Sequence, residues 1–402
     1  MNKFKIKLVL LQYVIFLFTN NTVAQTEVFK SNLYISEDNL SNFYSSISSD
    51  STQIYVNAND YYLYAFDKKT GTVNWSHYLA NKSNKTPIIY KNSIIIGKHI
   101  SEYVNKCIQL DCKSGDTLQT LKIKEISNQP FFKNDIMYVT AISEDTGGCI
   151  LAYNLTKNEI IWKQFIAHGV SKQPYFLKDK IVANAEDDNW FEIDYNGILK
   201  DTLCKKQAST FVENIKCVKY FRVLTHDNKE IDESFLSKNL GEYEVFKTKF
   251  YDNKTFFLGN ETLLILGKNK KILHKIDLNE SLAITDDYYN EFNEILKIEN
   301  NSIWLFVNNR IVEYNYQNKS VIREFDLSEW HPHCVILEND FIHLISKKDG
   351  QLYRVKLDFD TKASKALKAK AEMLNKINNY KPDLNKIEAE KAAREKLQNK
   401  NN

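Results

Sequence analysis

A motif that recurs every 43 or 44 residues constrains the fold of this 402-residue chain more than any other feature. Its first copy reads Ala65-x-Asp67-x-x-Thr70-Gly71-x-x-x-Trp75. The second copy keeps Asp111 and Gly115, and the third keeps the set Ala152, Asn154 and Trp162. A fixed interval of this length predicts an architecture built from repeated supersecondary units.

A second marker keeps the same interval. A proline followed by aliphatic or aromatic residues occurs between the copies of the motif, at Pro87, Pro130 and Pro174. Apolar runs such as Ile94-Ile-Ile96 follow these prolines and have the length and β-branched character of strands. Two independent markers with one period therefore predict a series of similar β-sheets.

The residues of the motif predict how one unit turns. The carboxylate of Asp67 is placed to accept hydrogen bonds from the backbone that follows it, which starts a turn. Gly71, Gly115 and Asn158 share one position, and all three residue types tolerate a positive φ angle. We expect Trp75 and Trp162 to lie on the strand that leaves the turn and to pack between neighbouring units, rather than to serve as ligand platforms.

The motif resembles the repeat of the pyrroloquinoline-quinone (PQQ) type of β-propeller. The similarity is closest in the first copy, spans roughly residues 50–200 and fades afterwards. This resemblance implies an all-β fold in which four-stranded antiparallel blades surround a central channel. Propellers commonly close their ring with a strand from one terminus, and residues 28–35 form a spare strand that could do so.

The spacing of the repeats predicts eight blades, with seven as the alternative. The blade anchors fall near residues 67, 111, 154, 194, 266, 315 and 356. The long interval between 194 and 266 leaves room for one further, degenerate blade around residues 211–240.

The segments outside the propeller predict an exported protein. Residues 1–24 combine three lysines, an apolar run of 11 residues and a small-residue cleavage site, as a signal peptide does. We assign residues 25–360 to the propeller and residues 361–402 to a basic tail, helical or partly disordered. No cysteine follows the apolar run, so a lipid anchor is not expected, and the mature chain should be a soluble periplasmic or secreted protein.

Charge separates the body from the tail. Residues 25–360 carry 40 basic and 46 acidic side chains, whereas residues 361–402 carry 11 basic and 5 acidic ones. A mildly acidic body offers no extended positive field, so no nucleic-acid partner is expected.

Six cysteines leave the redox state open. In an oxidising compartment they could form up to three disulfides, but a body of this size can also bury them as free thiols. We assign no pairing among Cys107, Cys112, Cys149, Cys204, Cys217 and Cys334.

The sequence predicts no catalytic residue, no cofactor site and no metal site. The repeat also resembles that of the PQQ-dependent dehydrogenases, which carry adjacent cysteines and calcium ligands. In this sequence no two cysteines are adjacent. His331, His333 and Cys334 are of metal-ligating types, but they coincide with the start of the last blade. We interpret the acidic clusters at residues 186–188 and 286–287 as solvated turns.

The sequence therefore predicts a binding or scaffolding module of the cell envelope, monomeric by default, whose partner is another envelope or secreted protein. In length and blade type the chain also resembles the propeller component of the outer-membrane β-barrel assembly machinery, although that component is a lipoprotein. Two alternatives stay open: a PQQ- or metal-dependent oxidoreductase, and a propeller that binds a glycan or another small ligand.

Overall fold

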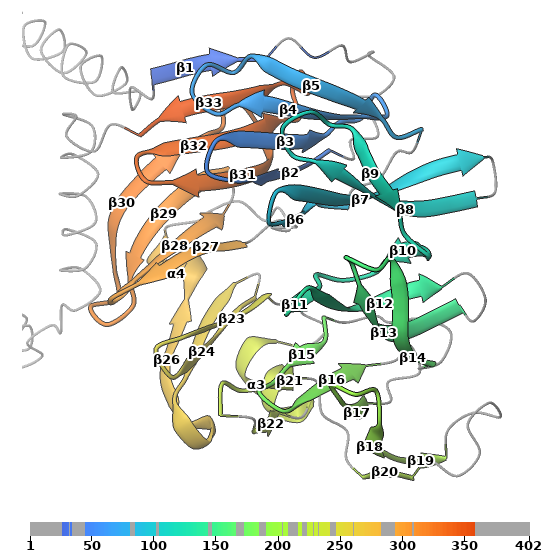
Figure 1. Cartoon of the computed structure of the whole chain (residues 1–402). Coiled ribbons are helices and arrows are strands. Elements are labelled where there is room, and N and C mark those ends of the chain that lie inside the picture. The colour runs from blue at the N-terminus through green and yellow to red at the C-terminus, as the bar shows by residue number, and fades with distance from the viewer. Residues whose placement is uncertain are drawn as a thin grey trace, which may run out of the picture.

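Each predicted repeat is one antiparallel sheet in the computed structural model, and the sheets stand around a common centre (Figure 1). The structure describes residues 26–31, 33, 45–80, 85–101, 104–143, 147–165, 173–184, 190–202, 204–207, 216–218, 223–227, 229–231, 233–241, 247–259, 261–282, 294–307 and 309–357. The predicted signal peptide and the basic tail lie outside these residues.

In every blade the strands follow one another outwards from the centre. Blade 1 contains β2 (Ser46–Ser49), β3 (Gln53–Asn57), β4 (Tyr62–Asp67) and β5 (Val73–Tyr78). Blade 2 contains β6 (Ile88–Tyr90), β7 (Ser93–Ser101), β8 (Val104–Asp111) and β9 (Thr117–Thr120).

Blade 3 differs because its innermost strand is split. Two short strands, β10 (Ile123–Ile126) and β11 (Phe131–Lys133), pair with opposite ends of β12 (Ile136–Ser143), which is followed by β13 (Gly147–Asn154) and β14 (Glu159–Phe165). Blade 4 contains β15 (Tyr175–Phe176), β16 (Lys180–Asn184), β17 (Trp190–Asp194) and β18 (Leu199–Thr202).

Three further blades complete the ring. Blade 5 contains β23 (Lys247–Tyr251), β24 (Lys254–Leu258), β25 (Thr262–Leu266) and β26 (Ile272–Asp277), with the short helices η1 (Lys268–Lys270) and α4 (Leu278–Ser281) beside it. Blade 6 contains β27 (Glu294–Glu299), β28 (Ser302–Val307), β29 (Arg310–Asn315) and β30 (Ser320–Asp326). Blade 7 contains β31 (Pro332–Glu338), β32 (Phe341–Ser346) and β33 (Leu352–Lys356).

The N-terminal strand supplies the fourth strand of blade 7. β1 (Thr26–Lys30) pairs antiparallel with β33, so the first described strand completes the last blade. Gln351 strengthens this junction, because its amide accepts from Leu33 N at 2.7 Å and donates to Leu33 O at 2.8 Å. Closure through a terminal strand leaves no gap between blade 7 and blade 1.

The expectation of eight blades is wrong, and the alternative of seven is confirmed for the part of the chain that the structure describes. Where we predicted a degenerate blade, two short hairpins occur instead, followed by α3 (Glu233–Leu240). The hairpins pair β19 (Cys204–Gln207) with β20 (Lys216–Val218) and β21 (Val223–Leu224) with β22 (Glu230–Ile231).

Helix α3 covers blade 5 as a further blade would have done. Leu236 and Leu240 of the helix and Ile231 of β22 are buried against Leu264 and other side chains of blade 5, with Tyr175 of blade 4 packed on the same cluster. An apolar helix face therefore takes the place of a sheet, which explains why the repeat motif is missing from this segment.

The repeated motif forms the turns at one end of the blades. The Asp67 carboxylate accepts from the backbone nitrogens of Lys69 at 3.0 Å and Thr70 at 2.8 Å, and these bonds help to hold its pKa below the usual value. Asp111 and Asn154 accept from the residues that follow them in the same way. Gly71, Gly115 and Asn158 have φ angles of 72°, 73° and 54°.

The tryptophans join neighbouring blades. Trp75 of blade 1 lies on Gly115 of blade 2, and its Nε1–H donates to the Cys112 carbonyl at 2.9 Å. Trp162 of blade 3 lies on Gly197 of blade 4 and donates to the Tyr195 carbonyl at 3.0 Å. The aromatic ring covers the next turn while its N–H satisfies a carbonyl there, so each contact both packs and aligns the two blades.

Other residue types make this contact in blades 2, 5 and 7. Gln119 of blade 2 donates its amide to the Leu155 carbonyl of blade 3 at 2.7 Å, and His274 of blade 5 packs edge-on against Tyr316 of blade 6. In blade 7 the ring of Phe29 lies on Gly71 of blade 1.

The hydrophobic core lies between the sheets. Ala65 and Trp75 belong to a cluster shared by blades 1 and 2, and Ala152 belongs to one shared by blades 3 and 4. Similar clusters fill the interfaces of blades 2 and 3, 5 and 6, 6 and 7, and 7 and 1. Because the sheets are buried on both faces, apolar residues dominate inner strands such as β3, β25 and β28. None of the described helices is long and apolar enough to cross a bilayer.

Candidate functional site

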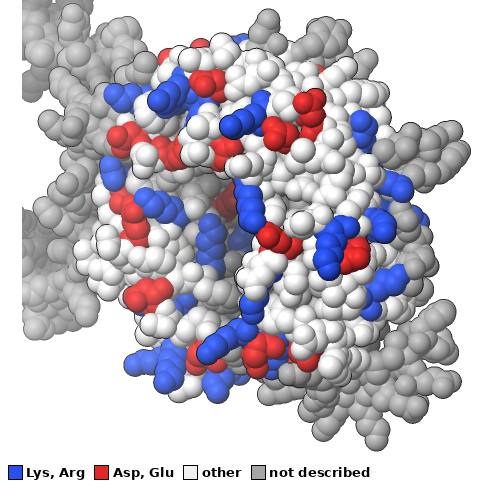
Figure 2. All heavy atoms as spheres, in the orientation of Figure 1, with Lys and Arg blue, Asp and Glu red and all other residues white. Residues whose placement is uncertain are grey.

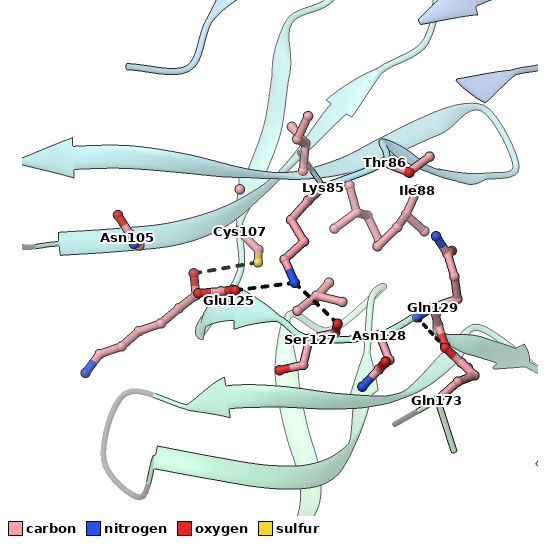
Figure 3. A pocket seen from close by; sticks show the side chains of 15 residues that line it. Lys85, Thr86, Ile88, Asn105, Cys107, Glu125, Ser127, Asn128, Gln129 and Gln173 are labelled. Atoms are coloured by element: carbon pink, nitrogen blue, oxygen red, sulfur yellow. Dashed lines mark hydrogen bonds and ion pairs between the residues drawn. The ribbon is translucent and has the colours of Figure 1, made fainter. Parts of the chain in front are cut away.

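A pocket of 560 Å³ opens between blades 2 and 3, beside their innermost strands (Figure 3). Four isoleucines contribute apolar surface, and the remaining lining is polar or small. The isoleucines are Ile88, Ile95, Ile96 and Ile126, and the other lining residues are Lys85, Thr86, Gly97, Asn105, Cys107, Lys124, Glu125, Ser127, Asn128, Gln129 and Gln173. Pockets of this volume are typical of ligand sites.

The pocket exists because the innermost strand of blade 3 is interrupted. Residues 127–130 leave the ladder between β10 and β11, and Pro130 could not have donated a ladder hydrogen bond. Ser127 keeps one backbone bond to Thr140, and the Asn128 amide donates to the Thr140 hydroxyl at 3.0 Å. Residues 127–130 thus have a defined conformation, and Ser127, Asn128 and Gln129 reach the pocket.

The proline marker of the repeat places the lining residues. A repeated proline comes directly before β6, β11 and β15, which form all or half of the innermost strand of their blades; these prolines are Pro87, Pro130 and Pro174. The residue before each proline therefore lies at the same end of its blade. These residues are Thr86, Gln129 and Gln173, and all three line the pocket. Three successive blades therefore contribute one equivalent position each.

Two of these residues bind each other across blades 3 and 4. The Gln173 side chain accepts from Gln129 N at 2.9 Å and donates to Gln129 O at 2.8 Å (Figure 3). This reciprocal pair joins the segments that precede two innermost strands, and it holds one side of the pocket in place.

Lys85 extends towards the opposite wall. Figure 3 shows its ammonium group between Glu125 and Ser127, with Nζ 3.6 Å from the Glu125 carboxylate and 3.4 Å from the Ser127 carbonyl. Both charged side chains are more than 40% exposed, at 47% and 43%. A long, exposed ion pair of this kind contributes little stability.

Cys107 supplies a thiol that is not reactive. Its Sγ lies 3.9 Å from the Lys124 carbonyl, and burial raises the pKa of the thiol to about 12. A protonated, buried thiol is a poor nucleophile at neutral pH. The polar part of the lining consists of amides, hydroxyls and the charged side chains Lys85, Lys124 and Glu125.

The other residues singled out in the sequence are not brought together. His333 and Cys334 lie on the innermost strand of blade 7, and burial lowers the pKa of His333 and raises that of Cys334 to about 12. Among the described residues, no three His, Cys, Asp or Glu side chains are grouped so that they could hold a metal ion. The acidic clusters at 186–188 and 286–287 lie outside the described residues.

Four cysteines whose side chains are described form no disulfide. These are Cys107, Cys112, Cys149 and Cys334. The side chains of Cys204 and Cys217 lie outside the described residues, so their pairing stays open.

Residues 35–129 match the family described as outer membrane protein assembly factor BamB. The ring of four-stranded blades shows the fold. The chain is a β-propeller with PQQ-like repeats. It resembles the BamB family over its first two blades and the start of the third.

Two solved structures resemble this propeller at 12% sequence identity. The crystal structure of BamB from Moraxella catarrhalis has a TM-score of 0.44, over 84% of this chain and 92% of the other. The crystal structure of the computationally designed Ika8 protein has a TM-score of 0.56, over 83% of this chain and 99% of the other. The likeness to Ika8 is one of fold alone. No curated protein matches the chain.

The sequence does not predict this pocket, although it carries two related signals. One is the polar residue before each repeated proline, and the other is Gly97 in the middle of an apolar strand. Neither signal identifies a pocket by itself, because the wall consists of residues from three successive blades.

Proposed function

We propose that this PQQ-like propeller is an exported binding module that holds another protein of the cell envelope, and that it is not an enzyme. The pocket between blades 2 and 3 carries the proposal. It lies at the end of the ring where the segments that precede the innermost strands converge, and its lining offers four amide side chains, two lysines and one glutamate. Rigid scaffolds commonly present recognition residues on such connecting segments.

The surface charge is consistent with a protein partner. Figure 2 shows acidic and basic side chains intermingled over one face, with a hollow at the centre of the ring. A mixed surface of this kind does not give the single-sign field of a nucleic-acid binder. The predicted signal peptide and the match to BamB over residues 35–129 support an envelope location.

Site-specific crosslinking in the native cell would test this function. A photo-reactive benzoylphenylalanine at Asn128 samples the pocket, and the same residue at Lys113 samples the turn at the other end of blade 2. We expect the Asn128 variant to give one adduct with a defined envelope protein, and the Lys113 variant to give none. An adduct from Lys113 alone, or none from either position, would contradict the proposal.

The alternative of a quinone- or metal-dependent oxidoreductase has a separate test. The purified mature chain is incubated with PQQ and calcium and assayed for dye reduction with alcohols and sugars. We expect no turnover. A measurable rate would replace the binding function with an enzymatic one.

A further inference from the structure

We infer that the basic tail of the chain binds its own propeller, and that a lysine of residues 361–370 places its ammonium group in a site on blade 1. We call this the blade-1 cation site, and it consists of Asp60, Tyr62, Tyr64, Ser76 and Tyr78. The inference concerns the chain's own tail and does not depend on the binding function proposed above. A comparison of blade 1 with blade 7, which holds such a cation from its own strand, supports it.

Blade 7 contains a complete example of the arrangement. The Lys30 ammonium group lies 2.8 Å from the Asp349 carboxylate and 5.4 Å from the centre of the Tyr353 ring. The Tyr353 hydroxyl donates to the same carboxylate at 2.6 Å. Lys30 reaches both groups because it lies on β1, directly opposite Tyr353 of β33. An ammonium group that contacts a carboxylate and a ring face gains from both contacts.

Blade 1 repeats this arrangement without the lysine. The Tyr64 hydroxyl donates to the Asp60 carboxylate at 2.5 Å, and the two residues have the same spacing of four as the pair in blade 7. Tyr64 of β4 pairs with Ser76 of β5, at the register position that Lys30 occupies in blade 7. Ser76 is exposed and uncharged. Among the described residues, no Lys, Arg or His side chain bonds to Asp60.

This difference changes the electrostatics of the two carboxyl groups. Burial acts to raise the pKa of both Asp60 and Asp349. At Asp349 the bonds from Lys30, Tyr353 and the backbone outweigh burial, so its pKa lies below the usual value. At Asp60 the bonds from Tyr64 and the backbone do not outweigh burial, so its pKa lies above the usual value. A cation beside Asp60 would therefore stabilise a carboxylate that its hydrogen bonds compensate only in part.

Two further tyrosines extend the ring surface of blade 1. The centre of the Tyr62 ring is 5.9 Å from that of Tyr64 and 5.1 Å from that of Tyr78. Tyr62 and Tyr78 are 36% and 52% exposed, so both are accessible from outside the blade. Aromatic rings attract ammonium groups and pack against the aliphatic stem of a lysine. The surface beside Asp60 therefore suits a lysine that comes from another segment.

The tail has the charge that the site requires. Residues 361–370 contain four lysines and no acidic residue. With 11 basic and 5 acidic side chains, residues 361–402 have a net charge of +6, whereas residues 25–360, with 40 basic and 46 acidic ones, have a net charge of −6. Opposite net charges favour association of the tail with the body.

The tail also starts close enough to reach the site. It follows Leu357, which comes directly after β33 of blade 7, and Tyr64 packs on the core cluster shared by blades 7 and 1. The site is therefore on the face of blade 1 that is turned towards blade 7. Residues 365–370 are 8 to 13 positions beyond Leu357, or about 26–43 Å of extended chain. A path along one strand and across to the next sheet takes about 20 Å and about 10 Å respectively.

The strength of the contacts favours a cation from the same chain. An exposed ion pair and an exposed cation–π contact each strengthen binding by only about fivefold or less. Contacts of this strength do not hold a separate molecule at low concentration. A short covalent connection gives an effective concentration in the millimolar range, at which the same contacts form.

Carbodiimide crosslinking of the full mature chain tests the inference. The reagent joins a carboxylate to a lysine that is in contact with it, and peptide mass spectrometry identifies the pair. We expect an adduct between Asp60 and a lysine of residues 361–370. The adduct between Lys30 and Asp349 is the internal standard, because these side chains are 2.8 Å apart. Replacement of the four lysines of residues 361–370 by glutamine should abolish the first adduct and leave the second unchanged.

Matched variants test the comparison between the blades. Ser76→Lys places a lysine opposite Tyr64, as in blade 7. We expect the adduct of Asp60 with the tail to fall at least tenfold in this variant, because the introduced lysine then couples to Asp60 instead. Thr120→Lys places a lysine at the equivalent position of blade 2, opposite Ile108, and should leave the tail adduct unchanged.

Four outcomes would overturn the inference. One is an uncoupled Asp60 in a chain whose Lys30–Asp349 adduct forms fully, and another is an equal yield of the tail adduct in Ser76→Lys. A third is an adduct between light and heavy peptides in a mixture of isotopically light and heavy chains, which would assign the lysine to a second copy. The fourth is coupling of Asp60 to another protein in native cells, which would assign the lysine to a partner.

Discussion

The indole ring of Trp75 lies directly on the backbone of Gly115, so that a Cβ added to the glycine would be 2.5 Å from the Cε3 atom of the ring. The two residues belong to neighbouring blades and are repeat positions of the same motif. The contact therefore shows how a local pattern produces long-range order: one copy of the motif provides the ring, and the next copy provides the flat turn that receives it.

This relationship predicts the cost of substituting Gly115. Gly115→Ala both strains a φ angle of 73° and collides with the Trp75 ring. Gly147 has a similar φ of 71°, but an added Cβ there meets no described atom within 4 Å. We expect Gly147→Ala to cost about 1 kcal/mol of unfolding free energy and Gly115→Ala about 2 to 4 kcal/mol, measured by urea denaturation. Equal losses of unfolding free energy in the two variants would show that the Trp75 ring moves away from the added Cβ without cost.

His343 predicts how stability depends on pH. It is fully buried on β32, opposite Arg354, and burial lowers its pKa to about 3, with Arg354 and Lys68 acting in the same direction. In the unfolded chain its pKa is about 6.5, so between these values the unfolded state binds the additional proton. The stability that this histidine contributes is therefore fully present above pH 6.5 and is lost as the pH falls towards 3.

A neutral substitution measures this contribution. Between pH 7.5 and 4.5 the unchanged chain should lose about 2 to 3 kcal/mol more unfolding free energy than His343→Gln, as followed by urea denaturation at both pH values. The same measurement on His333→Gln provides a comparison, because burial also lowers the pKa of His333. Parallel pH profiles for the unchanged chain and His343→Gln would contradict the prediction.

Cysteine reactivity tests the burial of the pocket wall. Burial raises the pKa of Cys107 and of Cys334 to about 12, so almost no thiolate exists at pH 8. A short pulse of iodoacetamide at pH 8, followed by peptide mass spectrometry, should leave both residues unmodified in the folded chain and modify both in 8 M urea. Rapid labelling of Cys107 in the folded chain would show that the wall between blades 2 and 3 opens.

The closing strand makes a fourth prediction. A chain that begins at residue 25 keeps β1, whereas one that begins at residue 32 loses it and with it Phe29, which lies over Gly71. We expect the shorter chain to lose at least about 3 kcal/mol of unfolding free energy and to associate through the exposed edge of β33. Calorimetry and light scattering would check both effects. A shorter chain that melts at the same temperature as a monomer would contradict the prediction.

Most of the ring could be predicted from the sequence because the residues that define each blade are close together in the chain. Asp67, Gly71 and Trp75 are all within one turn and one strand, and the interval between copies sets the spacing of the blades. The spare N-terminal strand was also predictable, since the last copy ends without a fourth strand.

The segment between blades 4 and 5 was not predictable in the same way. Residues 211–240 lack the motif, and the length of the interval alone suggested an eighth blade. Helix α3 instead buries Leu236 and Leu240 against blade 5. The pocket was missed for a different reason: its wall depends on the split of one strand at Pro130 and on contacts such as that between Gln129 and Gln173, which are 44 residues apart.

The pairing of β1 with β33 also imposes an order of events on synthesis. Ser31 and Gln351 bind each other although 320 positions separate them, so β1 has no pairing partner until β33 has been synthesised. A nascent chain that lacks β33 therefore cannot form the complete ring. Closure of the ring is a late step of folding, which follows the synthesis of every other blade.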